Sequence, residues 1–345
     1  MILLTYLSLR NTNYYITIPS GSLTYTYKEW NPFPHYSVSC SILIRVFTYV
    51  ISSGGELLQE TWGFLDSGLN DAATNMAIDE SLLNWHSKGL IPPTLRFYGW
   101  SIPTLTCGQF QNVERTLDLE AVTRNNCEFV RRLTGGSAVL HDDELTYSIV
   151  VSEKHERIPK SVTEAYYVLS KGVLEGYKNL GVNADYSMPE RKMLKERSAV
   201  CFEKSADYEM IVDGKKISGN AQTRKNGVLL QHGSIPMSID EIMLFELFKF
   251  SKDSIRDRQR KSFSNKATTI NEITQQKHTY EMLTRAFLEG FKTGIDIQLQ
   301  PFELTEDQWL EVRELADTKY RTDQWNLNRN KERVNHGKEN ENKKE

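Results

Sequence analysis

Apolar side chains recur at helical spacing in three stretches of this chain. The first covers residues 75–86, where apolar residues return every three or four positions. The second begins at about Thr163 and stops before Gly181, a residue type that often follows the last turn of a helix. The third covers residues 280–292, with Gly294 beyond its expected end. The spacing therefore predicts three amphipathic helices.

Short runs rich in β-branched and aromatic residues indicate strands. They cover residues 94–98, 129–132 and 146–151. Because these strands and the helices do not alternate regularly, a doubly wound domain is not indicated. We expect an α+β fold, with helices packed on a mixed or antiparallel sheet.

Residues 208–218 carry the clearest strand signal. Two strand-like runs flank Asp213-Gly214, a pair typical of a two-residue hairpin turn. Residues 225–227, Lys-Asn-Gly, then turn the chain into a further strand at 228–235. The pattern predicts a three-stranded antiparallel meander.

The two ends of the chain differ from its middle. Residues 1–57 are rich in Tyr, Thr, Ser and Asn without a persistent period, and we expect an extension outside the fold, disordered or produced by a gene start assigned too early. The second explanation rests on residues 54–56, Gly-Gly-Glu, which a translated ribosome-binding sequence would encode. Residues 327–345 are charged and almost without apolar side chains, which predicts a disordered tail. The folded domain is expected at 58–326, with its core at about 84–299.

Composition narrows the classes of function. A net charge of −3 among 345 residues gives no overall basic field for nucleic acid. The four cysteines lack the spacing of a disulfide framework or a zinc site, so we expect no metal and a reducing, cytoplasmic location. The longest apolar run, residues 42–51, contains Arg45 and is too short to span a bilayer.

A glycine pair, Gly135-Gly136, lies in the segment from Arg131 to Asp142. Backbone without side chains can approach a ligand closely and offer its N–H groups to an oxygen atom. An ordinary glycine turn would give the same pattern, although the neighbouring Arg132 favours a ligand site.

Cys201 is the candidate nucleophile. It follows a basic run at 191–197, and nearby cations lower the pKa of a thiol. Lys216, on the second strand of the hairpin, could return to the same place and act as an activator. A buried structural cysteine remains the alternative, and Cys107 and Cys127 are assigned to that class. The basic run could contact an acidic carrier protein or form a solvated loop.

Two histidines, His141 and His232, are possible general bases. Spacing places neither in a catalytic triad with an acid and a nucleophile. They are equally well explained as hydrogen-bonded polar residues of the fold.

Two long motifs resemble the biotin/lipoate A/B protein ligase family. They are Arg-Arg-x-Thr-Gly-Gly-x-Ala-Val-x-His-Asp at 131–142 and Gly-Lys-Lys-Ile-Ser-Gly-Asn-Ala-Gln at 214–222. The likeness covers about residues 58–326 and is greatest to the octanoyltransferase subfamily. Leu133 and Ser137 depart from the pattern, which has a proline and an arginine there.

The resemblance implies a biotin/lipoate protein ligase-like catalytic domain and assigns roles to residues. Cys201 would form an acyl-thioester, and Lys216 would lower the pKa of its thiol. The substrate-binding residues would be Arg132, Thr134, Gly135, Gly136 and His141.

The expected reaction moves an octanoyl group from octanoyl-acyl-carrier protein to a lysine of a lipoyl-carrier protein of the glycine-cleavage H type. No cofactor, nucleic acid or membrane is expected to take part, and the enzyme is expected to be a monomer. Three alternatives stay open: an ATP-dependent lipoate-protein ligase, an amidotransferase that takes octanoyl from another carrier protein, and a non-catalytic module that binds a lipoyl domain or an acyl ligand.

Overall fold

This computed structural model describes residues 5–9, 12–16, 59–187 and 209–328. Contacts divide the chain into two units, Met1–Leu58 and Gln59–Glu345. In the first unit β1 (Thr5–Leu9) and β2 (Thr12–Ile16) form an antiparallel hairpin, which the sequence analysis does not predict. Its threonine and tyrosine residues favour strands individually. All other described elements belong to the second unit.

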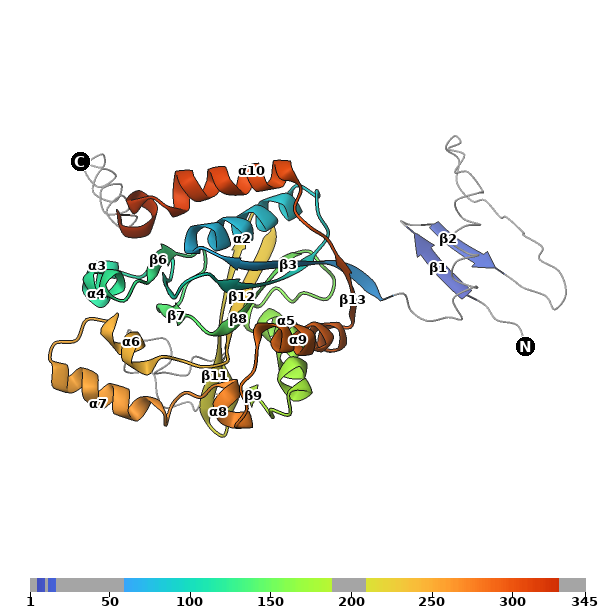
Figure 1. The fold of residues 1–345 in the computed structure, drawn as a ribbon. Helices are drawn as coiled ribbons and strands as arrows, with labels where there is room; N and C mark the ends of the chain where they lie inside the picture. Colours follow the sequence, from blue (N-terminus) through green and yellow to red (C-terminus); the bar gives the residue numbers. More distant parts are fainter. Residues whose placement is uncertain (1–4, 10–11, 17–58, 188–208, 329–345) are drawn as a thin grey trace, which may run out of the picture. The chain divides into compact units, whose positions relative to one another are not determined.

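An eight-stranded mixed sheet forms the centre of the second unit (Figure 1). Across the sheet the strands are β13 (Ile297–Pro301), β3 (Glu60–Asn70), β4 (Thr94–Trp100), β8 (Glu144–Ser152), β12 (Val228–Pro236), β11 (Lys215–Lys225), β10 (Met210–Val212) and β9 (Asp185–Tyr186). The pairs β13–β3 and β3–β4 are parallel, and the remaining pairs are antiparallel. This mixed sheet with packed helices confirms the α+β class.

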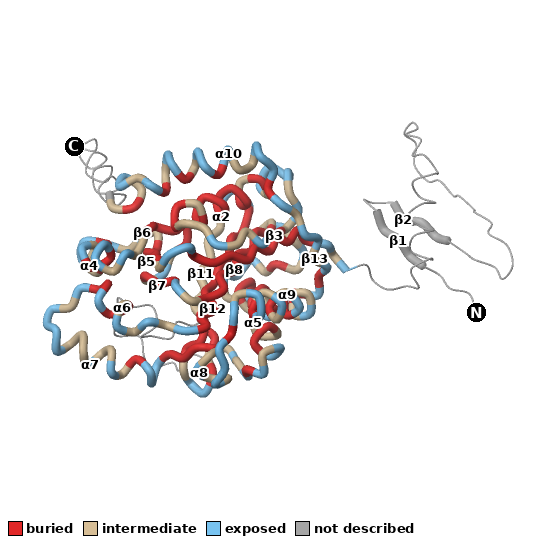
Figure 2. The backbone as a smooth tube through the Cα atoms, in the orientation of Figure 1, coloured by how far each residue is buried: buried red, intermediate tan, exposed pale blue. Residues whose placement is uncertain are grey.

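Alternation along the strands gives the sheet two covered faces. In β8, Tyr147 and Ile149 belong to a core cluster with α5 (Val162–Asn179) and α9 (Tyr280–Ile295). Val150, between Ile149 and Val151, belongs to a separate cluster with α2 (Ala72–Ser87). Helix α10 (Glu306–Leu315) lies outside α2 and is largely exposed. Figure 2 shows many of the buried segments in α2 and in the strands of the sheet.

The predicted helices and the meander are present, but α2 begins at Ala72, before the expected residue 75, and α9 extends beyond its expected end. Helix α9 continues past Gly294 and ends at Ile295, where Asp296 adopts the left-handed conformation with φ of 57°. A side chain at Gly294 would lie 2.5 Å from the backbone of Lys171, so this glycine serves the close packing of α9 on α5. Asp213 and Gly214 both have positive φ, as the predicted primed turn requires.

A second sheet, of three strands, lies beside the α2 face. It contains β6 (Glu128–Arg131), β5 (Thr104–Cys107) and β7 (Val139–His141), in that order. A third core cluster joins this sheet to four short helices. These helices are α3 (Val113–Thr116), α4 (Leu119–Arg124), α6 (Glu241–Glu246) and α7 (Asp253–Phe263).

Three short helical segments complete the described part of the chain. They are α8 (Ile270–Thr274) and two π-helical turns, η2 (Ala316–Tyr320) and η3 (Gln324–Asn328). Among the helices of the described residues, none combines the length and apolar character needed to cross a membrane.

Candidate active site

A pocket opens between the α2 face of the large sheet and the three-stranded sheet. Its apolar lining comes from Met76 on α2, Tyr98 and Trp100 on β4, and Val139 on β7. The empty space, which includes open solvent, is about 470 Å³. Sites for small molecules are concave and mostly apolar, with a few convergent polar groups. The pocket can therefore hold a small ligand with an apolar portion.

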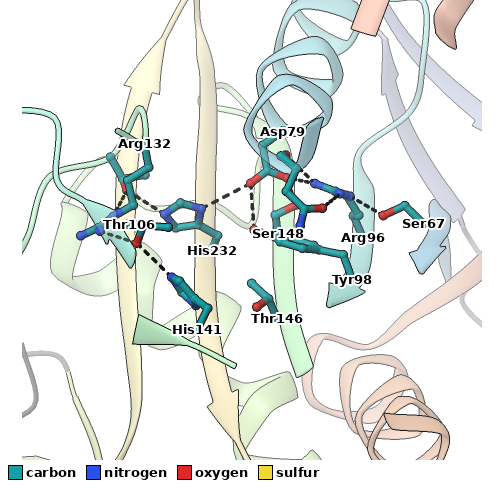
Figure 3. A network of polar contacts seen from close by, with 12 residues as sticks. Ser67, Asp79, Arg96, Tyr98, Thr106, Arg132, His141, Thr146, Ser148 and His232 are labelled. Atoms are coloured by element: carbon teal, nitrogen blue, oxygen red, sulfur yellow. Dashed lines mark hydrogen bonds and ion pairs between the residues drawn. The ribbon is translucent and has the colours of Figure 1, made fainter. Parts of the chain in front are cut away.

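Arg132 is the centre of the polar side of this pocket (Figure 3). Its side chain is buried, and Nε and Nη1 donate to the hydroxyls of Thr134 and Thr106 at 3.2 and 2.9 Å. Nη2 donates to the carbonyl oxygens of Gly135 and Ser137 at 2.9 and 2.8 Å. One guanidinium thus joins two hydroxyls to the backbone of the glycine loop, which we define as residues 134–138.

The hydroxyl of Thr134 is linked through His232 to a buried carboxylate. Thr134 Oγ1 lies 2.7 Å from His232 Nε2, and His232 Nδ1 lies 3.3 Å from Asp79 Oδ2. Burial raises the pKa of Asp79, but the Arg96 guanidinium and the imidazole lower it, and the net direction is down. Burial lowers the pKa of His232 and outweighs the opposing effect of the carboxylate. His232 is therefore neutral, with its proton on Nδ1 and Nε2 accepting from the hydroxyl.

The hydroxyl of Thr106 is linked in the same way through His141 to the carboxylate of Glu144. Thr106 Oγ1 lies 2.9 Å from His141 Nε2, and His141 Nδ1 lies 2.8 Å from Glu144 Oε1. Burial raises the pKa of Glu144, while His141 and the hydroxyl of Ser234 lower it, and the net direction is down. The Trp100 ring stacks on His141 with centroids 4.4 Å apart. Two carboxylate–histidine–threonine chains, which we call the relays, therefore converge on one arginine.

The backbone N–H groups of Gly135 and Gly136 are the other polar feature of the glycine loop. Gly136 is exposed and has φ of 95°, a conformation that glycine adopts without strain. In the described parts of the chain, neither the Gly135 N–H nor the Gly136 N–H donates to an acceptor. A side chain at Gly108 would lie 2.0 Å from the Gly136 carbonyl oxygen, so the backbone at Gly108 packs closely against the glycine loop. These two N–H groups are therefore available to donate to a ligand oxygen.

Lys216 lies at another edge of the pocket. Its side chain is 2% exposed, and its Nζ forms an ion pair with the carboxylate of Glu209. A Cβ built on Gly219, which lines the pocket, would lie 3.7 Å from Lys216 Nζ. A buried cation is thus placed next to the pocket, while the neighbouring Lys215 is partly exposed.

The structure brings most of the predicted site residues together. Arg132, Gly136 and His141 line the pocket, and the adjoining Thr134 and Gly135 are joined to Arg132. Lys216 lies at the pocket edge, as described above.

The predicted nucleophile, Cys201, lies outside the described residues. Cys107 and Cys127 have their pKa raised to about 11 by burial, so their thiols stay protonated near neutral pH.

Several residues of this site were not singled out from the sequence. The sequence analysis assigns no role to Asp79, Glu144 or Thr106, and it leaves His232 as either a possible base or a hydrogen-bonded residue of the fold. One signal was available for Asp79. It follows Asn75 by four positions on a helix, which puts two polar residues on one side of a mostly apolar element. The burial of Arg96 beside them requires the fold, since nothing local links strand to helix.

A family model, the lipoyl protein ligase A/B catalytic domain, matches residues 71–292. A protein of Anoxybacillus flavithermus named Octanoyltransferase LipM is 51% identical over 79% of this chain and 99% of its own length. A protein of Bacillus subtilis with the same name is 49% identical, with the same coverage of both chains. The solved bipartite lipoate protein ligase of Thermoplasma acidophilum is 25% identical with a TM-score of 0.64, covering 78% of this chain and 96% of that one.

Proposed function

The chain belongs to the lipoyl protein ligase A/B catalytic-domain family, and we propose that it transfers an octanoyl group from octanoyl-acyl-carrier protein to a lysine of a lipoyl-carrier protein. The observation that carries this proposal is the identity of about half of the aligned residues, over nearly the full length of relatives named Octanoyltransferase LipM. The acyl group passes through a thioester on Cys201.

Each half of the reaction exchanges one bond at the acyl carbonyl carbon. The Cys201 thiolate attacks the donor thioester, the bond to the pantetheine sulfur breaks, and that sulfur leaves as a thiolate that takes up a proton. The acceptor lysine amine then attacks the Cys201 thioester, the bond to Cys201 Sγ breaks, and the amine loses a proton as the amide forms. Covalent catalysis divides one transfer between two large proteins into two steps without nucleotide.

The glycine loop provides the electrostatic part of this mechanism. Negative charge develops on the carbonyl oxygen in both tetrahedral intermediates. The N–H groups of Gly135 and Gly136 are the donors proposed to stabilise it. Arg132 fixes the peptide that carries the Gly136 N–H, because its Nη2 donates to the Gly135 carbonyl oxygen. The Gln109 N–H fixes the peptide that carries the Gly135 N–H, because it donates to the Thr134 carbonyl oxygen at 2.8 Å. Removal of one such donor typically costs about 10²–10³ in kcat.

Lys216 is proposed to favour the thiolate of Cys201. A cation within a few ångströms lowers the pKa of a thiol. The Lys216 side chain is buried beside Gly219 at the pocket edge, and the Glu209 carboxylate holds it there. The apolar lining of Met76, Tyr98 and Trp100 would receive the acyl chain, with about 0.8 kcal/mol gained per buried methylene.

The decisive experiment supplies each acyl source separately and weighs an apo lipoyl-carrier acceptor by mass spectrometry. We expect an added octanoyl group with octanoyl-acyl-carrier protein and no nucleotide, and none with free octanoate and ATP. The enzyme itself should gain the mass of one octanoyl group, and Cys201→Ala should abolish both the adduct and the transfer. Cys107→Ala and Cys127→Ala serve as matched controls and should retain transfer.

Two other outcomes would overturn the proposal. Modification that appears only with free acid, ATP and magnesium would make the protein a ligase. Modification that proceeds from an octanoylated lipoyl carrier but not from octanoyl-acyl-carrier protein would make it an amidotransferase.

The proposed catalytic domain covers residues 58–326 and acts as a monomer. Residues 1–57 are proposed to be dispensable for transfer, as are residues 327–345. A thiol nucleophile is stable in a reducing compartment, and the proposed location is the cytoplasm.

A further inference from the structure

The strongest local charge in the described catalytic unit lies along α7 and its flanks. Residues 249–266 contain seven lysines and arginines and only two acidic residues, Asp253 and Asp257, in a chain of net charge −3. Both acids are near arginines of the same helix, at 3.4 Å from Arg256 and 3.8 Å from Arg260. A strongly basic surface therefore remains after these local pairs.

Three cations of this segment are exposed and face solvent. Lys252, Arg258 and Lys261 have no ion-pair partner among the described residues. Only the end of the helix is anchored, because Phe263 is buried and packs edge-on against Phe245 at 5.6 Å. Figure 2 shows the rest of α7 as exposed and intermediate backbone. We call Lys252, Arg258 and Lys261 the α7 basic surface.

The segment that follows α7 pairs with the strand that carries Lys216, at the edge of the candidate active site. After α7 the chain runs alongside Lys216, whose N–H donates to the Lys266 carbonyl at 2.8 Å. The Thr268 N–H in turn donates to the Lys216 carbonyl at 2.9 Å. A protein bound on α7 would thus sit next to the strand that carries Lys216, without covering the pocket, because no residue of α7 lines it.

We propose that the α7 basic surface docks the acidic carrier protein that delivers the acyl group. This inference rests on the proposed function. An acyl carrier presents its thioester on a long flexible arm, so its docking surface can lie beside the pocket. The acceptor lysine has only a short side chain, so the domain that carries it must itself approach the mouth of the pocket. Charge complementarity at such a rim mainly raises the rate of association.

The test compares a charge-reversed variant with wild type on two donors. The variant is Lys252→Glu/Arg258→Glu/Lys261→Glu, and the donors are octanoyl-acyl-carrier protein and octanoyl-pantetheine, which has no protein part. We expect the KM for the protein donor to rise about tenfold or more with kcat within about twofold, and the fall of kcat/KM with added salt to become shallower. Kinetics with octanoyl-pantetheine should not change.

The matched control reverses two exposed lysines on the loop after β8, Lys154→Glu/Lys160→Glu, and should behave as wild type with both donors. Fluorescence anisotropy with labelled carrier protein makes the same comparison without chemistry and should show about tenfold weaker binding for the α7 variant.

The proposal would be overturned if the α7 variant kept the wild-type KM and binding for the carrier protein. Equal losses of kcat/KM with both donors, or a rise in KM for the acceptor alone, would also overturn it. Equally strong binding of wild type to anionic vesicles or duplex DNA at the same salt would reassign the surface to another partner. Failure of the proposed function is a separate result, because wild type would then transfer from neither donor.

Discussion

Arg131 and Arg132 are neighbours in sequence, and both are almost fully buried, yet they organise different regions. Arg131 donates to the carbonyl oxygens of Gly108 and Asn326 at 2.9 and 2.8 Å. These bonds join η3, which we call the C-terminal turn, to the three-stranded sheet. Arg132 holds the glycine loop and the two relays. Of these two adjacent arginines, Arg131 therefore stabilises the fold and Arg132 organises the candidate active site.

The difference between these regions shows in what lies at the end of each network. The guanidinium contacts of Arg131 end on backbone carbonyl oxygens, which do not ionise. The contacts of Arg132 end, through two histidines, on Asp79 and Glu144. The ionised Asp79 fixes the tautomer of His232, and both imidazoles hold the hydroxyls that orient the guanidinium. We therefore expect changes at Arg132 to act on turnover and changes at Arg131 to act on stability.

The largest expected effect follows from Arg132→Lys. Lysine keeps the charge but cannot reproduce the planar fork that reaches four acceptors. We expect kcat to fall about 10²–10³-fold because the donors of the glycine loop lose their alignment. Arg131→Lys is the matched control and should lower the free energy of unfolding by about 2–3 kcal/mol while the folded fraction keeps its kcat within several-fold. Equal losses of kcat in both variants would erase the distinction.

The next effect concerns the buried end of a relay. Asp79→Asn leaves Arg96 without its carboxylate and should lower the free energy of unfolding by about 3 kcal/mol at pH 7. The pKa of Asp79 in the fold is below its ordinary 3.8, so the stability it contributes is present above that value and is lost as pH falls through the folded-state pKa. Denaturation from pH 7 to pH 2 should therefore show a weaker acid dependence in the variant.

The control for this pH series is Asp185→Asn, at an exposed position. It should leave the acid dependence close to that of wild type. A steep acid loss of stability that persists unchanged in Asp79→Asn would show that Asp79 is not a source of it.

A smaller shift is expected at the other edge of the pocket. Lys216→Met removes a buried cation, and the pH at which Cys201 reacts with iodoacetamide should rise by about one unit or more. Lys215→Met is the control, because adjacent side chains of a strand point to opposite faces and Lys215 is partly exposed. Alkylation profiles measured by mass spectrometry should separate the two variants. Identical profiles would remove Lys216 from the activation of Cys201.

The sequence predicted the helices, the strands and the motifs better than it predicted the hydrogen-bond network of the site. Periodicity and turn residues identified the meander, because Asp213-Gly214 and Asn226-Gly227 specify left-handed turns locally. The end of α9 was missed because Gly294 is required by contact with α5, which no local pattern contains.

The relays were missed for the same physical reason. Asp79 and His232 are 153 positions apart, and their contact depends on the packing of α2 against β12. Arg132 could be proposed from its motif, but its partners required the three-dimensional fold. The two histidines, which the sequence left as either bases or hydrogen-bonded residues, are hydrogen-bonded on both nitrogens.

The smallest expected effect tests the architectural side of the comparison. The Trp325 indole N–H donates to the Arg131 carbonyl at 2.7 Å, and Lys319 Nζ lies 4.0 Å from the ring centroid. Trp325→Phe removes the hydrogen bond but keeps an aromatic face for the lysine, so we expect a loss of about 1 kcal/mol in the free energy of unfolding. Transfer kinetics should stay as in wild type, because this contact ends on the backbone of β6 and reaches neither the glycine loop nor the relays. A change in kcat without a change in stability would mean that the C-terminal turn acts on the site through Arg131, and that the two arginines form one unit.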